Sequence, residues 1–147
     1  MAPPRSVTKV TRNGVEFTSN VERAQYTITE LVRAALRDSA KVIRRRSLDK
    51  ARKLPGLRRG KRPLNAFQYW LRKREGDLLV GIKHGTWYGV DQELGTNLQP
   101  KRGILKNSVY DNIDIIRQAQ AQYLSAIENE NSAFALIDEE ESVGEDE

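Results

Sequence analysis

The sequence predicts an α+β fold in which a long N-terminal helix and a C-terminal helix pack on a small antiparallel β-sheet with a central hairpin. Apolar residues recur at steps of three and four over residues 20–53 and again over 105–127, which is the spacing of helices with one apolar face. Between these segments, residues 67–72 alternate as on a half-buried strand, and an apolar stretch returns after a turn at 75–77. Two helices on one face of a small antiparallel sheet would bury both kinds of apolar surface.

Residues 1–18 are expected to form an N-terminal arm with a short strand or hairpin. The first six residues include two prolines, and the loosely alternating segment that follows contains Asn13-Gly14, a dipeptide that favours tight turns. Ser19 and Glu22 then fit the pattern in which a hydroxyl and a carboxylate cap the start of a helix reciprocally. The following helix is predicted to turn one stripe toward the core, made of Val21, Ala24, Ile28, Leu31, Val32, Ala35, Leu36, Val42 and Ile43.

The rest of the chain completes one α+β domain, predicted over residues 19–135. Prolines, glycines and basic residues over 55–65 indicate an exposed loop before the central hairpin. A third strand or extended segment is expected around Thr86 to Leu94, and the last helix is expected to begin between residues 102 and 108 and to run to about 130. Residues 136–147 are predicted to be an acidic, disordered tail, because the run of carboxylates from Asp138 offers little to bury.

The composition gives little support to catalysis, to a metal site or to a cofactor. The chain has no cysteine, so it has neither a disulfide framework nor a thiolate metal site. Its one histidine, His84, lacks the partners of a zinc site or of an activated nucleophile. Asp91 and Glu93 would share one face of a strand, but a solvated or interface pair explains them as well. No apolar run is long enough to span a membrane, and no signal peptide is recognisable, so we expect a soluble protein without catalytic residues.

Charge is distributed unevenly along the chain. Residues 1–74 contain 20 Lys and Arg against 5 Asp and Glu, whereas residues 75–147 contain 5 against 15. Opposed charges favour contacts between neighbouring copies, so the basic helix of one copy is expected to face the acidic half of the next. The alternative is a nucleic-acid-binding module, because basic groups near the aromatic Tyr69 and Trp70 can hold a phosphate backbone. Its candidate contacts are Arg44, Arg45, Arg46, Arg58, Arg59, Lys61 and Arg62.

One segment, residues 86–100, carries a more specific pattern. A tyrosine is followed by a Glu-Leu-Gly-Thr stretch, a Gln-Pro pair and the last helix, and the matching positions are Tyr88, Glu93, Gly95, Thr96, Gln99 and Pro100. This pattern resembles the signature of the head–tail joining proteins of long-tailed bacteriophages, which are also called tail-completion or neck proteins. The order of elements over residues 20–130 is similar as well. Leu94 departs from the pattern, because an aromatic residue is usual at that position.

The resemblance implies a structural virion protein with no reaction to perform. Copies would form a ring, six-fold to match a tail, around the channel through which DNA leaves the head. A head-completion or connector protein would bind on one side, and a tail-terminator or tail-tube protein on the other. The protein would be made in the host cytoplasm and end in the neck of the particle, without contact with a membrane.

Overall fold

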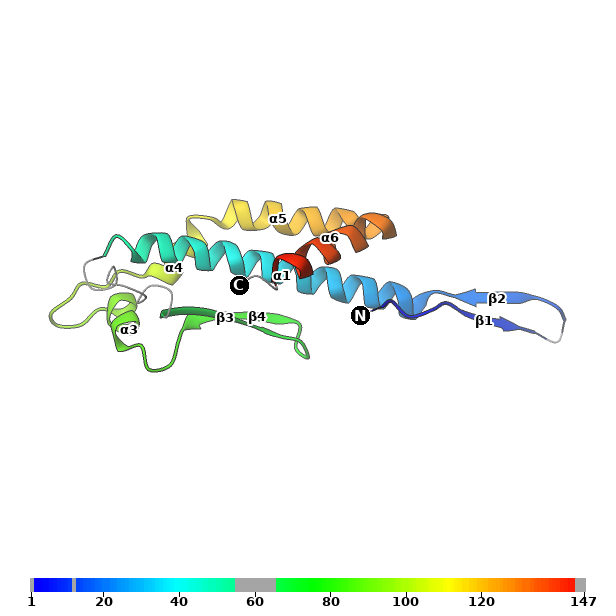
Figure 1. The fold of residues 1–147 in the computed structure, drawn as a ribbon, viewed down its shortest axis with the longest axis horizontal. Coiled ribbons are helices and arrows are strands. Elements are labelled where there is room, and N and C mark those ends of the chain that lie inside the picture. Colours follow the sequence, from blue (N-terminus) through cyan, green and yellow to red (C-terminus); the bar gives the residue numbers. More distant parts are fainter. Residues whose placement is uncertain (1, 12, 55–65, 145–147) are drawn as a thin grey trace.

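A single long helix, α1 (Val21–Ala51), forms the axis of the molecule (Figure 1). The computed structural model describes residues 2–11, 13–54 and 66–144. With 31 residues, α1 is about 46 Å long. The prediction of a helix over residues 20–53 is confirmed. The predicted capping box is wrong, because Asn20 occupies the N-cap position and no side chain caps this end.

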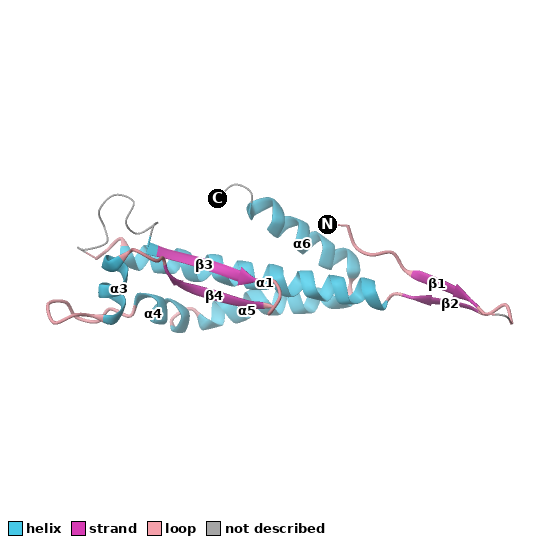
Figure 2. Cartoon of the chain, turned by 90° about the horizontal axis from the view of Figure 1, so that it is seen from below, coloured by secondary structure: helices cyan, strands magenta, loops and turns pink. Residues whose placement is uncertain are grey.

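An N-terminal hairpin precedes α1 and consists of β1 (Val7–Val10) and β2 (Glu16–Ser19). The strands are antiparallel, with Val7 opposite Ser19 and Lys9 opposite Phe17. Their turn is closed by the amide of Gly14, which donates to the carbonyl of Thr11. The hairpin therefore forms as the Asn13-Gly14 dipeptide predicted. It projects beyond the N-terminal end of α1, away from the rest of the molecule, in both views (Figures 1 and 2).

A second hairpin lies along α1 and consists of β3 (Phe67–Arg72) and β4 (Asp77–Ile82). The inward positions of β3 follow the predicted alternation, since Phe67 is buried whereas Trp70 is 67% exposed. Two arginines of α1 contact the backbone at the two ends of β3, one at its first residue and one at Lys73, just after its last residue. Arg44 donates from Nε to the carbonyl of Phe67 at 3.3 Å, and Arg33 donates to the carbonyl of Lys73 at 3.2 Å. These contacts fix β3 antiparallel to the helix.

The segment predicted to be a third strand is a helix, α3 (Trp87–Leu94). Among the residues that the structure describes, the central sheet therefore has two strands. Helical winding places Gly89 where α3 approaches β4, and a Cβ atom there would lie 2.9 Å from the Cγ2 atom of Ile82. It also places Asp91 and Glu93 on different faces, so the expectation of one shared carboxylate face is wrong.

The predicted C-terminal helix is divided into several pieces. They are α4 (Ile104–Tyr110), α5 (Ile113–Ser125), the short 3₁₀ helix η1 (Ala126–Glu128) and α6 (Glu130–Gly144). Residues 136–144 were predicted to be disordered, but they belong to helix α6. This helix forms because Ala133 and Ile137, in its first half, are buried against Leu31 and Ala34 of α1.

The α+β fold class is confirmed, with α1 lying between the central hairpin on one side and α5 on the other (Figure 1). The C-terminal helix was predicted to pack on the sheet, but α4, α5 and α6 pack mainly on α1. One part of the core joins Leu48 and Ala51 to Phe67 and Ile104, and the other joins α1 to α5 and α6. The N-terminal part of the predicted stripe stays uncovered, since Val21, Ile28 and Val32 are 60%, 43% and 40% exposed.

Candidate functional site

The Gly-Thr part of the motif forms a tight turn between α3 and α4. Gly95 ends α3 with φ 79° and ψ 163°, a conformation that is almost restricted to glycine. The amide of Thr96 donates to the carbonyl of Gln99 at 2.9 Å, and the amide of Gln99 donates back at 3.2 Å. A Cβ atom on Gly95 would lie 2.7 Å from the backbone nitrogen of Lys101. The turn therefore requires glycine for its conformation and for its packing.

Glu93 holds the start of the next helix. Its carboxylate accepts the backbone amides of Leu105 at 2.9 Å and of Lys106 at 3.3 Å. A carboxylate at this end satisfies amides that have no partner within the helix and interacts favourably with the helix dipole. The partner of the Glu93 carboxylate is thus the N-terminus of α4.

The remaining motif residues support the same turn to different degrees. Tyr88 is half-buried against the core cluster of Leu48, Ala51, Ala66, Phe67 and Ile104. Gln99 accepts from Nε2 of Gln92 at 2.7 Å, and Gln92 is only 6% exposed. Pro100 is exposed at the end of the turn. Gln92 was not singled out from the sequence, although its position next to Glu93 offered a signal. The six motif residues all lie on one continuous segment, which consists of α3 and the turn that follows it.

This segment presents an uncovered apolar stripe. On α3, Trp87, Val90 and Leu94 follow one another at helical spacing and are 65%, 42% and 64% exposed. Leu98, at the tip of the turn, is 95% exposed. Contiguous exposed apolar residues of this kind mark surfaces that bind other proteins. The motif therefore uses its polar groups internally and leaves apolar side chains on the outside.

The basic residues of α1 partly converge on a cleft beside β3. Lys41, Arg44, Arg45 and Arg52 line this cleft together with Tyr69, and its volume is about 530 Å³. Two carboxylates lie in the same wall, and one of them, Asp49, is 3.8 Å from Arg52. Arg46 does not line the cleft. The other basic candidates, which are Arg58, Arg59, Lys61 and Arg62, lie outside the described residues.

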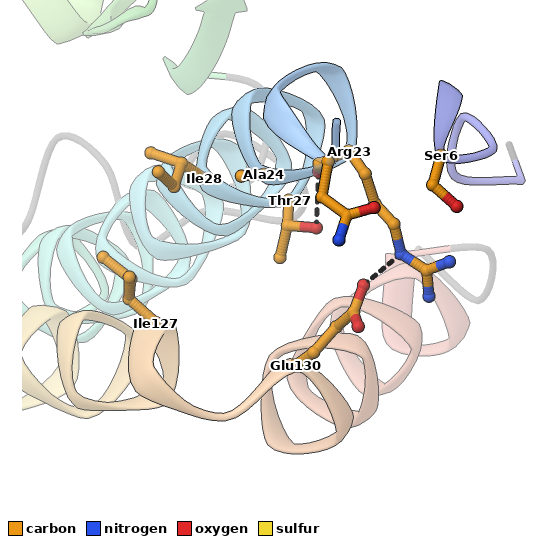
Figure 3. Close-up of a pocket in the computed structure, with 8 residues that line it drawn as sticks. Ser6, Arg23, Ala24, Thr27, Ile28, Ile127 and Glu130 are labelled. Carbon is orange, nitrogen blue, oxygen red and sulfur yellow. Dashed lines mark hydrogen bonds and ion pairs between the residues drawn. The ribbon is translucent and has the colours of Figure 1, made fainter. Parts of the chain in front are cut away.

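A second cleft opens where the N-terminal hairpin meets the helices (Figure 3). It has a volume of about 430 Å³ and extends from Ser6 across the start of α1 to Ile127. An ion pair between Arg23 and Glu130 crosses its polar end. Thr27 uses its hydroxyl to donate to the carbonyl of Arg23 at 3.0 Å. Arg23, Thr27 and Glu130 are thus engaged with one another in this cleft.

The two oppositely charged halves of the sequence meet within a single chain. Lys50 of α1 lies 2.6 Å from Asp111, and Arg23 pairs with Glu130 of α6. Part of the charge that was expected to face a neighbouring copy is therefore neutralised internally. The Lys50 and Asp111 side chains remain 36% and 63% exposed, so this pair is partly screened by water.

Within residues 2–11, 13–54 and 66–144, no three His, Asp or Glu side chains gather closely enough to hold a metal ion. His84 lies in the exposed turn between β4 and α3. None of the helices described is long and apolar enough to cross a membrane.

Comparison of the chain with protein-family models, with curated proteins and with solved structures finds no match in any of the three.

Proposed function

We propose that this chain is a non-catalytic structural subunit that joins the head and tail of a bacteriophage particle at the neck. The proposal rests on the motif from Tyr88 to Pro100. Its polar residues are used to fix a rigid turn, and that turn carries an exposed stripe of Trp87, Val90 and Leu94. A site built in this way offers a fixed apolar surface to another protein, which is what a joining subunit requires.

The partners follow from the same proposal. Identical copies would form a ring, taken as six-fold, around the channel through which DNA passes. A head-completion or connector protein would bind one face, and a tail-terminator or tail-tube protein the other. The elongated shape supports contacts at two separate places, since the N-terminal hairpin and α3 lie at opposite ends of α1 (Figure 1). Both places carry exposed apolar residues, among them Phe17 at 63% and Trp87 at 65%.

The proposal is tested in particles of the phage that encodes the chain. Removing the chain should leave filled heads and separate tails, counted by electron microscopy, and imaging of complete particles should locate it at the neck. Complementation with Trp87→Asp should fail to restore joined particles, whereas Trp87→Phe, which keeps an apolar ring, should restore them. Infective particles that lack the chain would refute the proposal.

Nucleic-acid binding is the second candidate function, and the basic cleft favours it. Arg44, Arg45 and Arg52 lie beside Tyr69 in one concave surface, and such a surface can hold a phosphate backbone next to a base. Two carboxylates in the wall weaken the attraction, and Arg44 already donates to the backbone of β3. For these reasons we place this function second.

Binding of a short DNA duplex by the purified chain separates the two candidates. If the cleft binds DNA, Arg45→Ala should weaken binding and reduce its dependence on salt, because a phosphate contact is lost. Arg46→Ala is the matched control, since Arg46 is an exposed arginine of the same helix that does not line the cleft. Equal effects of the two variants would exclude the cleft as the binding site.

A further inference from the structure

The N-terminal hairpin has one face of mostly apolar residues that no described part of the chain covers. The register places Val7 and Phe17 on the same face, since Val7 pairs with Ser19 and Lys9 with Phe17. The carbonyl of Val15 accepts the amide of Thr11, so these two residues form the next pair after Val10 and Glu16. Val15 is two residues before Phe17 and therefore lies on the same face. Val7, Val15 and Phe17 are 44%, 61% and 63% exposed.

A hairpin of this kind needs a partner. An isolated two-stranded hairpin is marginally stable in water and gains stability by packing against a further element. The hairpin extends beyond the N-terminal end of α1 in both views and points away from the helices (Figures 1 and 2). Its apolar face is therefore available for packing against another molecule.

A matching uncovered groove lies between α1 and α5. Its lining is apolar except for one glutamine and consists of Leu31, Val32, Ala35, Leu36, Gln120, Tyr123, Leu124 and Ile127. The groove has a volume of about 190 Å³. Val32 of α1, Leu124 of α5 and Ile127 of η1 remain 40%, 61% and 41% exposed, although the sequence pattern predicted that Val32 would face the core.

The hairpin and the groove are of comparable size. The four residues of β1 span about 13 Å, and the groove lining spans about 8 Å along α1, from Leu31 to Leu36, and about 10 Å from Gln120 to Ile127. The charges at their edges are compatible as well. Lys9 lies on the apolar face beside Phe17, and the exposed carboxylate of Glu128 follows Ile127 at the end of the groove.

We propose that the N-terminal hairpin of one copy of this chain packs into the α1–α5 groove of a second copy. The hairpin leads directly into α1 at Asn20 and continues away from its own groove, so it cannot reach that groove without a reversal of the chain. Such a contact joins two different surfaces of identical subunits, and repeated contacts of this type close into rings when the rotation allows. The inference rests on the proposed function in taking identical copies as neighbours.

Engineered cysteines test the contact, because the natural chain contains none. Two variants, Phe17→Cys and Leu124→Cys, are mixed at high concentration under mild oxidation, with a short tag on one so that mass spectrometry separates mixed from like dimers. Thr18→Cys is the matched control, because Thr18 lies on the opposite face of the same strand. All three cysteines replace exposed residues, and circular dichroism verifies that each variant is folded.

The mixed disulfide between positions 17 and 124 should form about tenfold faster than the one between 18 and 124, because only the first pair brings its Cβ atoms within bonding distance. Equal rates would overturn the proposal, and so would a predominance of dimers linked through position 17 alone. A chain carrying both cysteines should give a ladder of linked copies, and closure within a monomer would also overturn it.

The crosslinking experiment and the experiment with phage particles can fail separately. A failed crosslink in a protein that still occupies the neck removes only the hairpin contact. A successful crosslink in a protein missing from particles removes only the proposed role at the neck.

Discussion

Replacing Gly95 with alanine tests whether the turn after α3 depends on glycine for two separate reasons. The conformation at φ 79° and ψ 163° costs a residue with a side chain about 1–3 kcal/mol. The added Cβ atom would also lie 2.7 Å from the nitrogen and 3.0 Å from the Cα atom of Lys101, and forced overlap of this kind costs about 1–3 kcal/mol. Gly95→Ala should therefore lower the free energy of unfolding by about 3 kcal/mol.

Two other glycines separate these contributions. Gly76 has φ 66° with open space around its Cα atom, so Gly76→Ala should cost only the conformational part, about 1–2 kcal/mol. Gly81 lies in a strand, has no positive φ and also faces open space, so Gly81→Ala should be neutral or stabilise by up to about 1 kcal/mol.

Urea denaturation of the three variants, followed by tryptophan fluorescence and circular dichroism, gives the free energies of unfolding. The expected order of destabilisation is Gly95→Ala, then Gly76→Ala, then Gly81→Ala. If Gly95→Ala were no worse than Gly76→Ala, the contact with the backbone of Lys101 would have no energetic weight. If all three were alike, the argument from backbone conformation would fail.

Three further predictions concern single side chains. Glu93→Gln should lower the free energy of unfolding by about 1 kcal/mol, because it removes the charge that caps α4. Asp91→Asn on the same helix is the control and should change the free energy of unfolding by less than about 0.5 kcal/mol in the same urea titration. Hydrogen bonds from Arg72 lower the pKa of Asp77, so this carboxylate stabilises the fold above its unfolded pKa of about 4 and ceases to do so as the pH falls through the lower folded pKa. Asp77→Asn should flatten the acid limb of a pH titration of stability, and an unchanged limb would contradict this. Ser47 buries a hydroxyl that has no hydrogen-bond partner among the described residues. Ser47→Ala should therefore raise the free energy of unfolding by about 0.5–1 kcal/mol, seen as a higher melting temperature.

The parts of the fold that local patterns specify were predictable from the sequence. The turn at Asn13-Gly14 and the alternation over 67–72 each predict a hairpin, and both hairpins form. The three-and-four spacing over 20–53 predicts α1 within two residues at its C-terminal end. In each case the signal is a periodicity or a turn dipeptide that acts over a few residues.

The errors arose where tertiary contacts decide the structure. The segment Trp87–Leu94 is too short for its apolar spacing to separate a strand from a helix, and the close packing of Gly89 on Ile82 is visible only in the fold. The acidic C-terminal segment is helical because Ala133 and Ile137 pack on α1, a contact between residues about 100 positions apart in the sequence. The sequence motif includes Glu93, but the partner of its carboxylate is the backbone at the start of α4, which no residue pattern specifies.

The distribution of charge also changes meaning once the fold is known. Along the sequence the basic half and the acidic half are separate, which favours electrostatic docking between copies. In the folded chain the same halves lie against each other, and Lys50 and Arg23 pair with Asp111 and Glu130 of their own chain. Apolar surface also remains uncovered, because the N-terminal hairpin, the α1–α5 groove and the α3 stripe all keep exposed side chains. In the proposed assembly, burial of these surfaces would contribute more than exposed ion pairs, which are each worth less than about 1 kcal/mol.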